Sequence, residues 1–169
     1  MRSNPEITVS FTGHRTYADQ IREELTRLVE ELYAAGRRRF LSGMAAGFDL
    51  AAAEAVLGCR ERLEGLQLIA VVPFEGQQAR FTPADRERFE RVLEAADERL
   101  VLAPAFHRGC YAVRNDYLVR EASLVVAWYD GSAGGTRDTV RRALRRGRTV
   151  LNLYPAVRLS VQPVQGELF

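Results

Sequence analysis

Residues 66–72, with the sequence LQLIAVV, decide the fold of this 169-residue chain. The run is short, rich in Leu, Ile and Val, and apolar on both alternating faces. Such a run is typical of a strand that is covered on both sides, as in the centre of a parallel sheet. We therefore expect this segment to be a central strand of a sheet with helices on each face.

Outward from this run, short apolar segments alternate with amphipathic segments of helical period. The expected strands are 7–11 (ITVSF), 40–41, 66–72, 99–102, 124–128 (LVVAW) and 149–153. The expected helices are about 17–35, 49–59, a segment from residue 83, 111–122 and 136–146. This alternation predicts an α/β fold of Rossmann-like type, a three-layer α/β/α arrangement with a mostly parallel central sheet of about six strands.

Cap residues predict where several helices begin and end. Thr16 followed by Asp19 resembles a capping box for the first helix, and Gly36 is its expected end. Thr82 and Pro83 are typical of a helix start, with a capping hydroxyl and a proline at the first helical position.

Composition indicates one globular domain. The net charge is +2, and all 24 basic residues are arginine, which suits phosphate recognition but does not by itself indicate nucleic acid. Cys59 and Cys110 fit neither a metal site nor a disulfide framework. We expect a cytoplasmic protein without signal peptide, membrane span or metal, with a nucleotide-binding domain over 1–154 and a loosely ordered tail over 155–169.

The loops that follow the strands carry the expected chemistry, because they meet at one edge of a parallel sheet. Residues 42–49 (SGMAAGFD) and 130–136 (DGSAGGT) are glycine-rich and lead directly into helices. Backbone N–H groups and the helix dipole at such a start favour an anion. Neither loop is a dinucleotide fingerprint or a P-loop. Together they predict a phosphate-bearing, nucleotide-like ligand.

Several side chains in these loops have both a structural and a functional interpretation. His14 is either a general acid or base or a hydrogen-bonded loop residue, and Arg15 is either a phosphate clamp or a solvated charge. Asp49 either caps the next helix or binds a ribose hydroxyl.

Three further residues leave the same alternatives open. Glu75 is either a base or sugar ligand or an exposed loop carboxylate. Asn115 either contacts a base or ribose or forms, with Arg114, a pair on a helix surface. The arginine-rich run over 141–148 is expected near a helix carboxyl end from the dipole alone.

The ordered set of motifs resembles the YpsA-like branch of the SLOG superfamily over about residues 7–153. The motifs are GHR after the first strand, GMAAGFDLAAAE after the second, PFE-x-Q after the third, RN on a later helix and GGT after the fifth strand. The resemblance implies a Rossmann-like domain that binds nucleotides or nucleotide sugars, such as ADP-ribose or NAD derivatives, as a sensor or regulator. The candidate ligand-binding residues are Gly13, His14, Arg15, Gly43, Met44, Gly47, Asp49, Glu75, Arg114, Asn115, Gly134, Gly135 and Thr136.

One departure separates the chain from the LOG-type enzymes of the superfamily. Their motif PGG-x-GT-x-x-E ends in a catalytic glutamate, whereas Thr139 stands at that position here. A hydrolase of nucleotide N-glycosidic or phosphate bonds is therefore the alternative function, with Glu75 or His14 as candidate catalytic residues and Asp49 as another available carboxylate.

Partners supply the remaining hypotheses. The Smf/DprA proteins of the superfamily bind single-stranded DNA, so a DprA-like role in DNA processing is a third hypothesis, although the composition does not favour nucleic acid. Homodimers are expected by analogy with relatives. The chain end, with Gln165, Leu168 and Phe169, is similar to the Q-x-x-L-F peptides that bind the bacterial sliding clamp.

Overall fold

The structure is a computed structural model that describes residues 4–155, so the clamp-like peptide and residues 156–169 of the predicted tail lie outside the described residues. Its centre is a six-stranded parallel sheet with the strand order β4-β3-β2-β1-β5-β6. The strands are β1 (Thr8–Gly13), β2 (Arg39–Ser42), β3 (Gln67–Val72), β4 (Glu98–Val101), β5 (Leu124–Trp128) and β6 (Thr149–Asn152).

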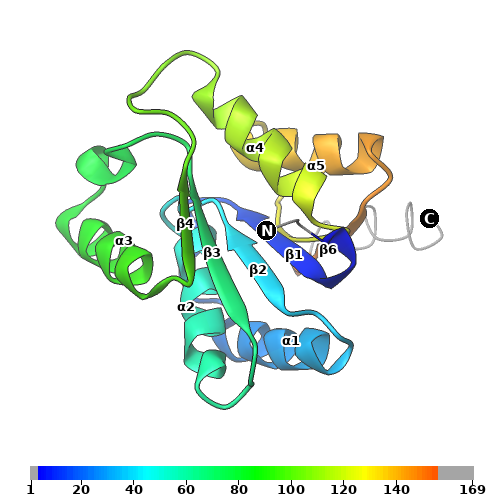
Figure 1. Ribbon diagram of the computed structural model, residues 1–169. Helices are drawn as coiled ribbons and strands as arrows, with labels where there is room; N and C mark the ends of the chain where they lie inside the picture. Colours follow the sequence, from blue (N-terminus) through cyan, green and yellow to red (C-terminus); the bar gives the residue numbers. More distant parts are fainter. Residues whose placement is uncertain (1–3, 156–169) are drawn as a thin grey trace.

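Helices cover both faces of this sheet (Figure 1). One face carries α1 (Arg22–Ala34), α2 (Phe48–Arg60) and α3 (Pro83–Ala95), and the other carries α4 (Cys110–Glu121) and α5 (Gly135–Arg145). Two short 3-10 helices, η1 (Pro5–Ile7) and η2 (Gln77–Arg80), precede β1 and α3. The predicted three-layer α/β/α fold is confirmed, and the sheet is entirely parallel.

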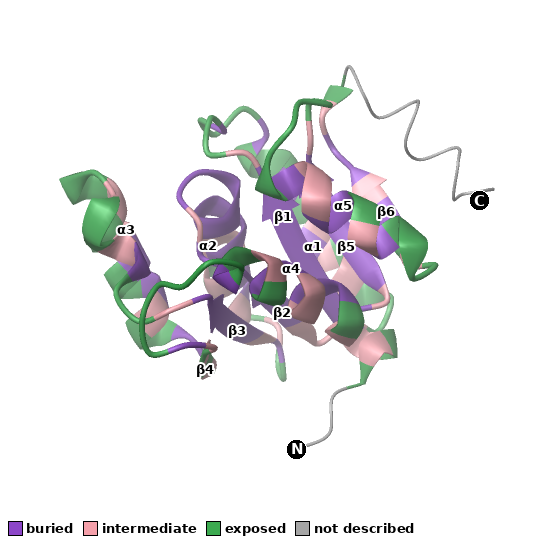
Figure 2. Ribbon diagram, turned by 90° about the horizontal axis from the view of Figure 1, so that it is seen from above, coloured by how far each residue is buried: buried purple, intermediate pink, exposed green. Residues whose placement is uncertain are grey.

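The main core lies between the sheet and α1, α2 and α3. Val9 and Phe11 of β1 point to this side, where the Phe11 ring stacks on Phe40 at 5.9 Å and meets Phe48 edge-on at 6.2 Å. Figure 2 shows that buried residues concentrate in the strands and on the inner faces of the helices. Burial of these rings removes a large apolar area from water and is the main stabilising term of the fold.

The opposite face of β1 is polar and small. Ser10 is fully buried there and donates a hydrogen bond of 2.8 Å from its hydroxyl to the Leu118 carbonyl of α4. Two smaller apolar clusters complete this face of the sheet. One contains Val119, Val125, Ala127, Val140, Ala143 and Val150, and the other contains Leu41, Ile69, Val71 and Leu118.

One local expectation is corrected by the structure, and two are confirmed. The capping box at Thr16 is wrong, because α1 begins at Arg22 without a side-chain cap and Asp19 adopts a left-handed backbone conformation (φ 62°). The 66–72 run is confirmed as a buried internal strand, because β3 lies between β2 and β4. The predicted cap at Thr82 is confirmed, since its side chain accepts a hydrogen bond from the Asp85 N–H at 3.2 Å.

The strand order places a crevice at one defined point. From β1 the chain adds β2, β3 and β4 on one side, then returns to place β5 and β6 on the other side of β1. The loops after β1 and β5 therefore leave the sheet toward opposite layers. In parallel α/β sheets, such a switch point is where ligands bind.

The end of β1 fits tightly against the start of α2. A Cβ atom on Gly13 would lie 2.4 Å from the Phe48 Cβ, which the backbone of α2 holds in place. Gly58, in the last turn of α2, has no atom within 4 Å of the corresponding position. The two glycines therefore differ in the space available to a methyl group.

We predict that Gly13→Ala lowers the free energy of unfolding by about 1–3 kcal/mol, because the added methyl overpacks the contact with Phe48. The matched control, Gly58→Ala, is expected to raise it by about 0.5–1 kcal/mol, since alanine is the better helix former. Urea denaturation followed by circular dichroism measures both. A Gly13→Ala variant as stable as the wild type would contradict the tight packing described here.

Candidate ligand-binding cleft

An open cleft of about 510 Å³ lies at the carboxyl ends of β1 and β5. Its volume is within the range of small-molecule sites. Its wall comes from the loops after β1, β2, β3 and β5 and from the first turns of α2, α4 and α5. Most of the predicted ligand-binding residues line it, namely Gly13, His14, Arg15, Asp49, Arg114, Asn115, Gly134, Gly135 and Thr136.

Four predicted residues, Gly43, Met44, Gly47 and Glu75, are not among the residues that line this cleft in the described part of the chain. A Cβ on Gly43 would lie 2.8 Å from the Arg114 guanidinium. Gly47 has φ 90° and is in tight contact with the backbone of the β1 loop, and Met44 is fully buried with φ 65°. Packing behind the cleft accounts for both glycines, and Glu75 is exposed on the loop after β3.

The first turn of α5 presents unpaired backbone donors to the cleft. The helix has no side-chain cap, and its first internal hydrogen bond runs from the Asp138 N–H to the Gly134 carbonyl at 3.1 Å. The N–H groups of Gly135, Thr136 and Arg137 have no hydrogen-bond acceptor within residues 4–155. Added Cβ atoms at Gly134 and Gly135 would meet no atom within 4 Å. The positive end of this helix is therefore open to an anion.

The glycine-rich loop before α2 differs from the loop before α5. Its Phe48 N–H donates to the His14 carbonyl and its Leu50 N–H to the Ala45 carbonyl, both at 3.3 Å. The Ala45 N–H donates to the Asp49 carboxylate, also at 3.3 Å. These donors are consumed inside the protein. We expected both loops to offer N–H groups to a phosphate, and the structure favours the α5 loop.

Asp49 brings a buried carboxyl to the cleft. It is 4% exposed, and its Oδ1 has no hydrogen-bond partner among the described residues. Burial raises the pKa of this carboxyl from 3.8 to about 6, while the nearby Arg114 charge and the N–H groups of Ala45 and Gly13 oppose the rise. An unsatisfied buried oxygen is unfavourable, so a hydroxyl or N–H of a ligand that reached Oδ1 would be stabilised.

Gln77 is a second buried residue with an unsatisfied atom at the cleft. It is 6% exposed, and its Oε1 lacks a partner within residues 4–155. The PFE-x-Q motif contains Gln77, but the motif directed attention to the charged Glu75. Gln77 lines the cleft and Glu75 does not, so the charge of Glu75 was a misleading guide to which residue of the motif contacts the cleft.

Arg114 and Asn115 form a network that joins three elements. The Arg114 guanidinium donates to the Gly43 carbonyl and, at 2.9 Å, to the Asn115 side-chain oxygen. The Asn115 amide in turn donates to Asp138 in the first turn of α5 at 3.1 Å. Burial lowers the pKa of Arg114, and the Asp49 carboxyl opposes this effect. The network orients α5 relative to the loop after β2.

His14 links the two loops of the switch point. Its Nε2 lies 2.8 Å from the Asp130 carboxylate and 3.1 Å from the Asp130 N–H. Hydrogen bonds from the Ser132 hydroxyl and N–H, followed by the contact with His14, lower the pKa of Asp130. His14 is therefore a hydrogen-bonded loop residue. The neighbouring Arg15 is exposed at the cleft and makes no ion pair within the described residues.

Asp130, Ser132 and Tyr111 also line the cleft, and sequence reasoning did not select them. Their loops were identified, but which side chains turn inward depends on the tertiary arrangement. Within residues 4–155, no group of three or more His, Cys, Asp or Glu side chains is placed to hold a metal ion. No helix in this part of the chain is long and apolar enough to span a bilayer.

Comparisons with known proteins agree with this architecture. The model of the YspA SLOG family matches residues 4–154. The SPbeta prophage-derived protein YoqJ of Bacillus subtilis is 26% identical over 151 residues, covering 80% of this chain and 88% of that protein. A UPF0398 protein of Halalkalibacterium halodurans is 27% identical over 136 residues, covering 78% of this chain and 70% of that protein.

Two solved structures share the fold at low sequence identity. DNA processing protein A (DprA) of Streptococcus pneumoniae superposes with a TM-score of 0.62 and 20% identity over 86% of this chain, which spans 49% of that protein. A molybdenum cofactor binding protein of Rippkaea orientalis gives a TM-score of 0.63 and 16% identity, covering 96% of this chain and 86% of that one.

The buried Asp49 carboxyl generates a pH prediction. The unfolded chain releases this proton near pH 3.8, whereas the folded protein holds it until about pH 6. The folded state therefore binds more protons in this window, and the free energy of unfolding contributed by Asp49 falls as pH rises from about 4 to 6. We expect the free energy of unfolding of the wild type minus that of Asp49→Asn to decrease by about 2 kcal/mol across this window and to be constant above pH 7.

Urea denaturation of both proteins at pH values between 4 and 8 measures this difference. Asp85→Asn is a suitable control, because it removes a carboxylate from the first turn of α3, away from the cleft lining. A wild-type minus Asp49→Asn difference that rises with pH over this window would show that the Arg114 charge outweighs burial.

Proposed function

The chain belongs to the YspA SLOG family, and we propose that its cleft binds a nucleotide-like ligand through a phosphate held at the first turn of α5. The supporting observation is the set of N–H groups at Gly135, Thr136 and Arg137 without an acceptor in the described residues, at a helix start whose Gly135 and Thr136 line a cleft of about 510 Å³. A phosphate oxygen accepts such hydrogen bonds, and its charge is complementary to the helix dipole. Arg15 supplies a further unpaired positive charge at the same cleft.

The sugar part of the ligand has a candidate partner in Asp49. Its free Oδ1 can accept a hydrogen bond from a ribose hydroxyl, as acidic residues do in other nucleotide-binding Rossmann folds. Gln77 offers a second free acceptor in the same wall. We propose a ligand of the ADP-ribose or NAD-related class. We also propose a sensor or regulatory role, because the donors and acceptors described here are sufficient for binding and binding alone needs no catalytic group.

Hydrolysis of an N-glycosidic or phosphate bond is the second candidate function, and one observation favours a particular residue for it. A hydrolase needs a carboxyl that exchanges protons near neutral pH. Asp49 lines the cleft with a pKa of about 6, whereas Glu75 is not among the lining residues. In this hypothesis Asp49 takes the role first assigned to Glu75 or His14.

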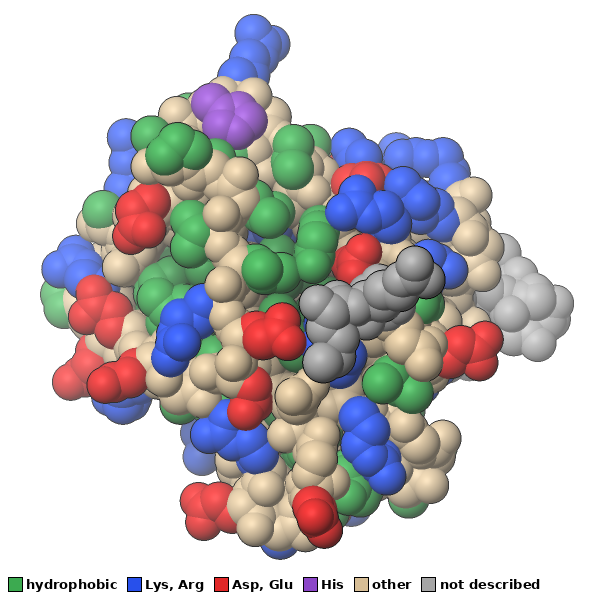
Figure 3. Space-filling model, viewed as in Figure 1, with side chains coloured by type: hydrophobic (Ala, Val, Ile, Leu, Met, Phe, Trp, Pro, Cys, Tyr) green, Lys and Arg blue, Asp and Glu red, His purple; other side chains and the backbone are tan. Residues whose placement is uncertain are grey.

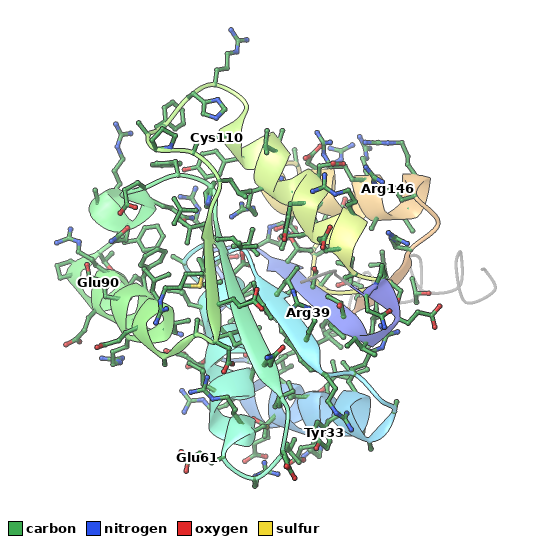
Figure 4. All side chains as sticks on the ribbon, viewed as in Figure 1. Tyr33, Arg39, Glu61, Glu90, Cys110 and Arg146 are labelled. Atoms are coloured by element: carbon green, nitrogen blue, oxygen red, sulfur yellow. The ribbon has the colours of Figure 1, made fainter. Side chains whose placement is uncertain are left out.

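A DprA-like role in DNA processing rests on the shared fold, and the surface arginines do not add to it. Arg142 of α5 and Arg146, the residue that follows α5, lie 3.7 and 3.2 Å from Asp116 of α4, so these members of the arginine-rich run join two helices. Figure 3 shows the basic side chains gathered over this part of the molecule, and Figure 4 labels Arg146 among them. Binding to single-stranded DNA with a steep salt dependence would favour the DNA hypothesis over the nucleotide hypothesis.

A thermal-shift screen against nucleotides, NAD and ADP-ribose tests the proposal. At a ligand concentration of about 100 times Kd, binding stabilises the folded state by about 2.7 kcal/mol, which raises Tm by several degrees. We expect Gly135→Val to weaken binding by about tenfold to a hundredfold, because its side chain occupies the space in front of the free N–H groups.

Gly58→Val is the matched control, because this glycine also has open space around its Cβ position and does not line the cleft. It should bind as the wild type does. Chromatography of the same mixtures detects turnover, and product formation that Asp49→Asn abolishes would favour the hydrolase. No shift with any of these ligands would contradict the nucleotide proposal.

A further inference from the structure

Three aromatic side chains from separate segments meet in one cluster, and one of them, Tyr111, lines the cleft. Phe74 follows β3, Phe106 lies between β4 and α4, and Tyr111 is in the first turn of α4. The Phe74 ring meets Phe106 and Tyr111 edge-on, with centroids 5.5 and 5.8 Å apart, and Phe106 and Tyr111 are 6.3 Å apart. We call these three residues the aromatic cluster.

The aromatic cluster remains open to solvent although its rings pack on one another. Phe106 is 63% exposed and Tyr111 is 43% exposed. Figure 3 shows hydrophobic side chains gathered in the upper part of the molecule, where the segment between β4 and α4 runs in Figure 1. Cys110, labelled in Figure 4, marks the start of α4 beside Tyr111. Exposed rings held in a fixed arrangement are a feature of recognition surfaces.

Tyr111 connects the aromatic cluster to the proposed phosphate site. It lines the same cleft as Gly135 and Thr136. The guanidinium carbon of Arg114 lies 5.7 Å from the centroid of the Tyr111 ring, so a buried cation supports this ring from within the protein. The cleft therefore has an anion-binding part at α5 and an aromatic part at α4.

We propose that the aromatic cluster is the base-binding part of the site, with the nucleobase of the ligand stacked on the Tyr111 ring. This proposal rests on the proposed function, since it takes the phosphate to lie at α5. A nucleotide carries an anionic group and a flat aromatic group in one molecule, which matches the two parts of the cleft. Stacking accepts the π-face of any base, so the cluster contributes affinity for a base without selecting its identity.

A small-molecule nucleotide ligand fits the observations better than a nucleic acid strand. The cleft holds about 510 Å³, which is within the range of small-molecule sites. A strand requires successive stacking rings along a basic groove, whereas the rings here contact one another within a single cluster. The aromatic cluster therefore offers a single base-stacking position.

The test compares ADP with inorganic pyrophosphate, which lacks base and sugar, by isothermal titration. We expect Tyr111→Ala to weaken ADP binding by about tenfold to a hundredfold and to leave pyrophosphate binding unchanged. Tyr111→Phe should bind ADP within about twofold of the wild type, because the ring is kept. Val113→Ala is the matched control, since Val113 is an exposed apolar residue of the same helix outside the cluster and is 53% exposed.

Each outcome separates this inference from the proposed function. Equal loss of ADP and pyrophosphate binding in Tyr111→Ala, or no loss of either, would overturn the base-binding role. The proposal of a phosphate site at α5 would not be contradicted by either result, because the wild type still binds pyrophosphate. A wild-type protein that binds neither probe would contradict the phosphate site and the base position together. Tighter wild-type binding of an oligothymidine than of ADP, lost in Tyr111→Ala, would assign the ring surface to single-stranded nucleic acid and overturn the single-base proposal.

Discussion

The position of β1 between β2 and β5 is the constraint on which the rest of the structure depends. Because the chain builds the sheet outward from β1 in two directions, the loops after β1 and β5 diverge and leave a crevice between them. Right-handed crossovers then place α1, α2 and α3 on one face and α4 and α5 on the other. The start of α5 reaches the crevice for this reason, and so do the first turns of α2 and α4.

The two glycine-rich loops differ in how tightly they pack within this sheet. The loop before α2 lies against the end of β1, with Gly13 facing Phe48 and Gly47 facing the backbone of Arg15. In this packed arrangement the Phe48 and Leu50 N–H groups donate to the His14 and Ala45 carbonyls, and the Ala45 N–H donates to Asp49. The first turn of α5 is different, because the N–H groups of Gly135, Thr136 and Arg137 have no acceptor in the described residues. The network from Gly43 through Arg114 and Asn115 to Asp138 fixes the position of these donors relative to the rest of the cleft.

Much of the fold could be predicted from the sequence, because apolar period and the alternation of strands and helices are local signals. The LVVAW and ITVSF runs became β5 and β1 within one or two residues. The start of α1 was predicted too early, because Asp19 adopts a left-handed conformation before the helix and pairs with Arg22, its first residue. No local pattern reveals that choice.

The location of the site at one edge of the sheet could be predicted from the sequence, but its individual side-chain contacts could not. Asp49 and the GGT segment were found because motif and topology coincide there. Gln77, Asp130 and Tyr111 were missed, because the direction of a loop side chain depends on neighbours that are distant in sequence. The same reason explains why the two glycine loops could not be distinguished from sequence, although the Ala45, Phe48 and Leu50 N–H groups have acceptors inside the protein and those of Gly135, Thr136 and Arg137 have none in the described residues.

Backbone amide chemical shifts of the nitrogen-15-labelled protein test the central claim, that the first turn of α5 is the anion site, most directly. On titration with inorganic pyrophosphate, the amides of Gly135, Thr136 and Arg137 should show the largest changes in the described chain, because their N–H groups gain an acceptor. Saturable changes centred on the loop before α2, with the α5 amides unmoved, would contradict the account.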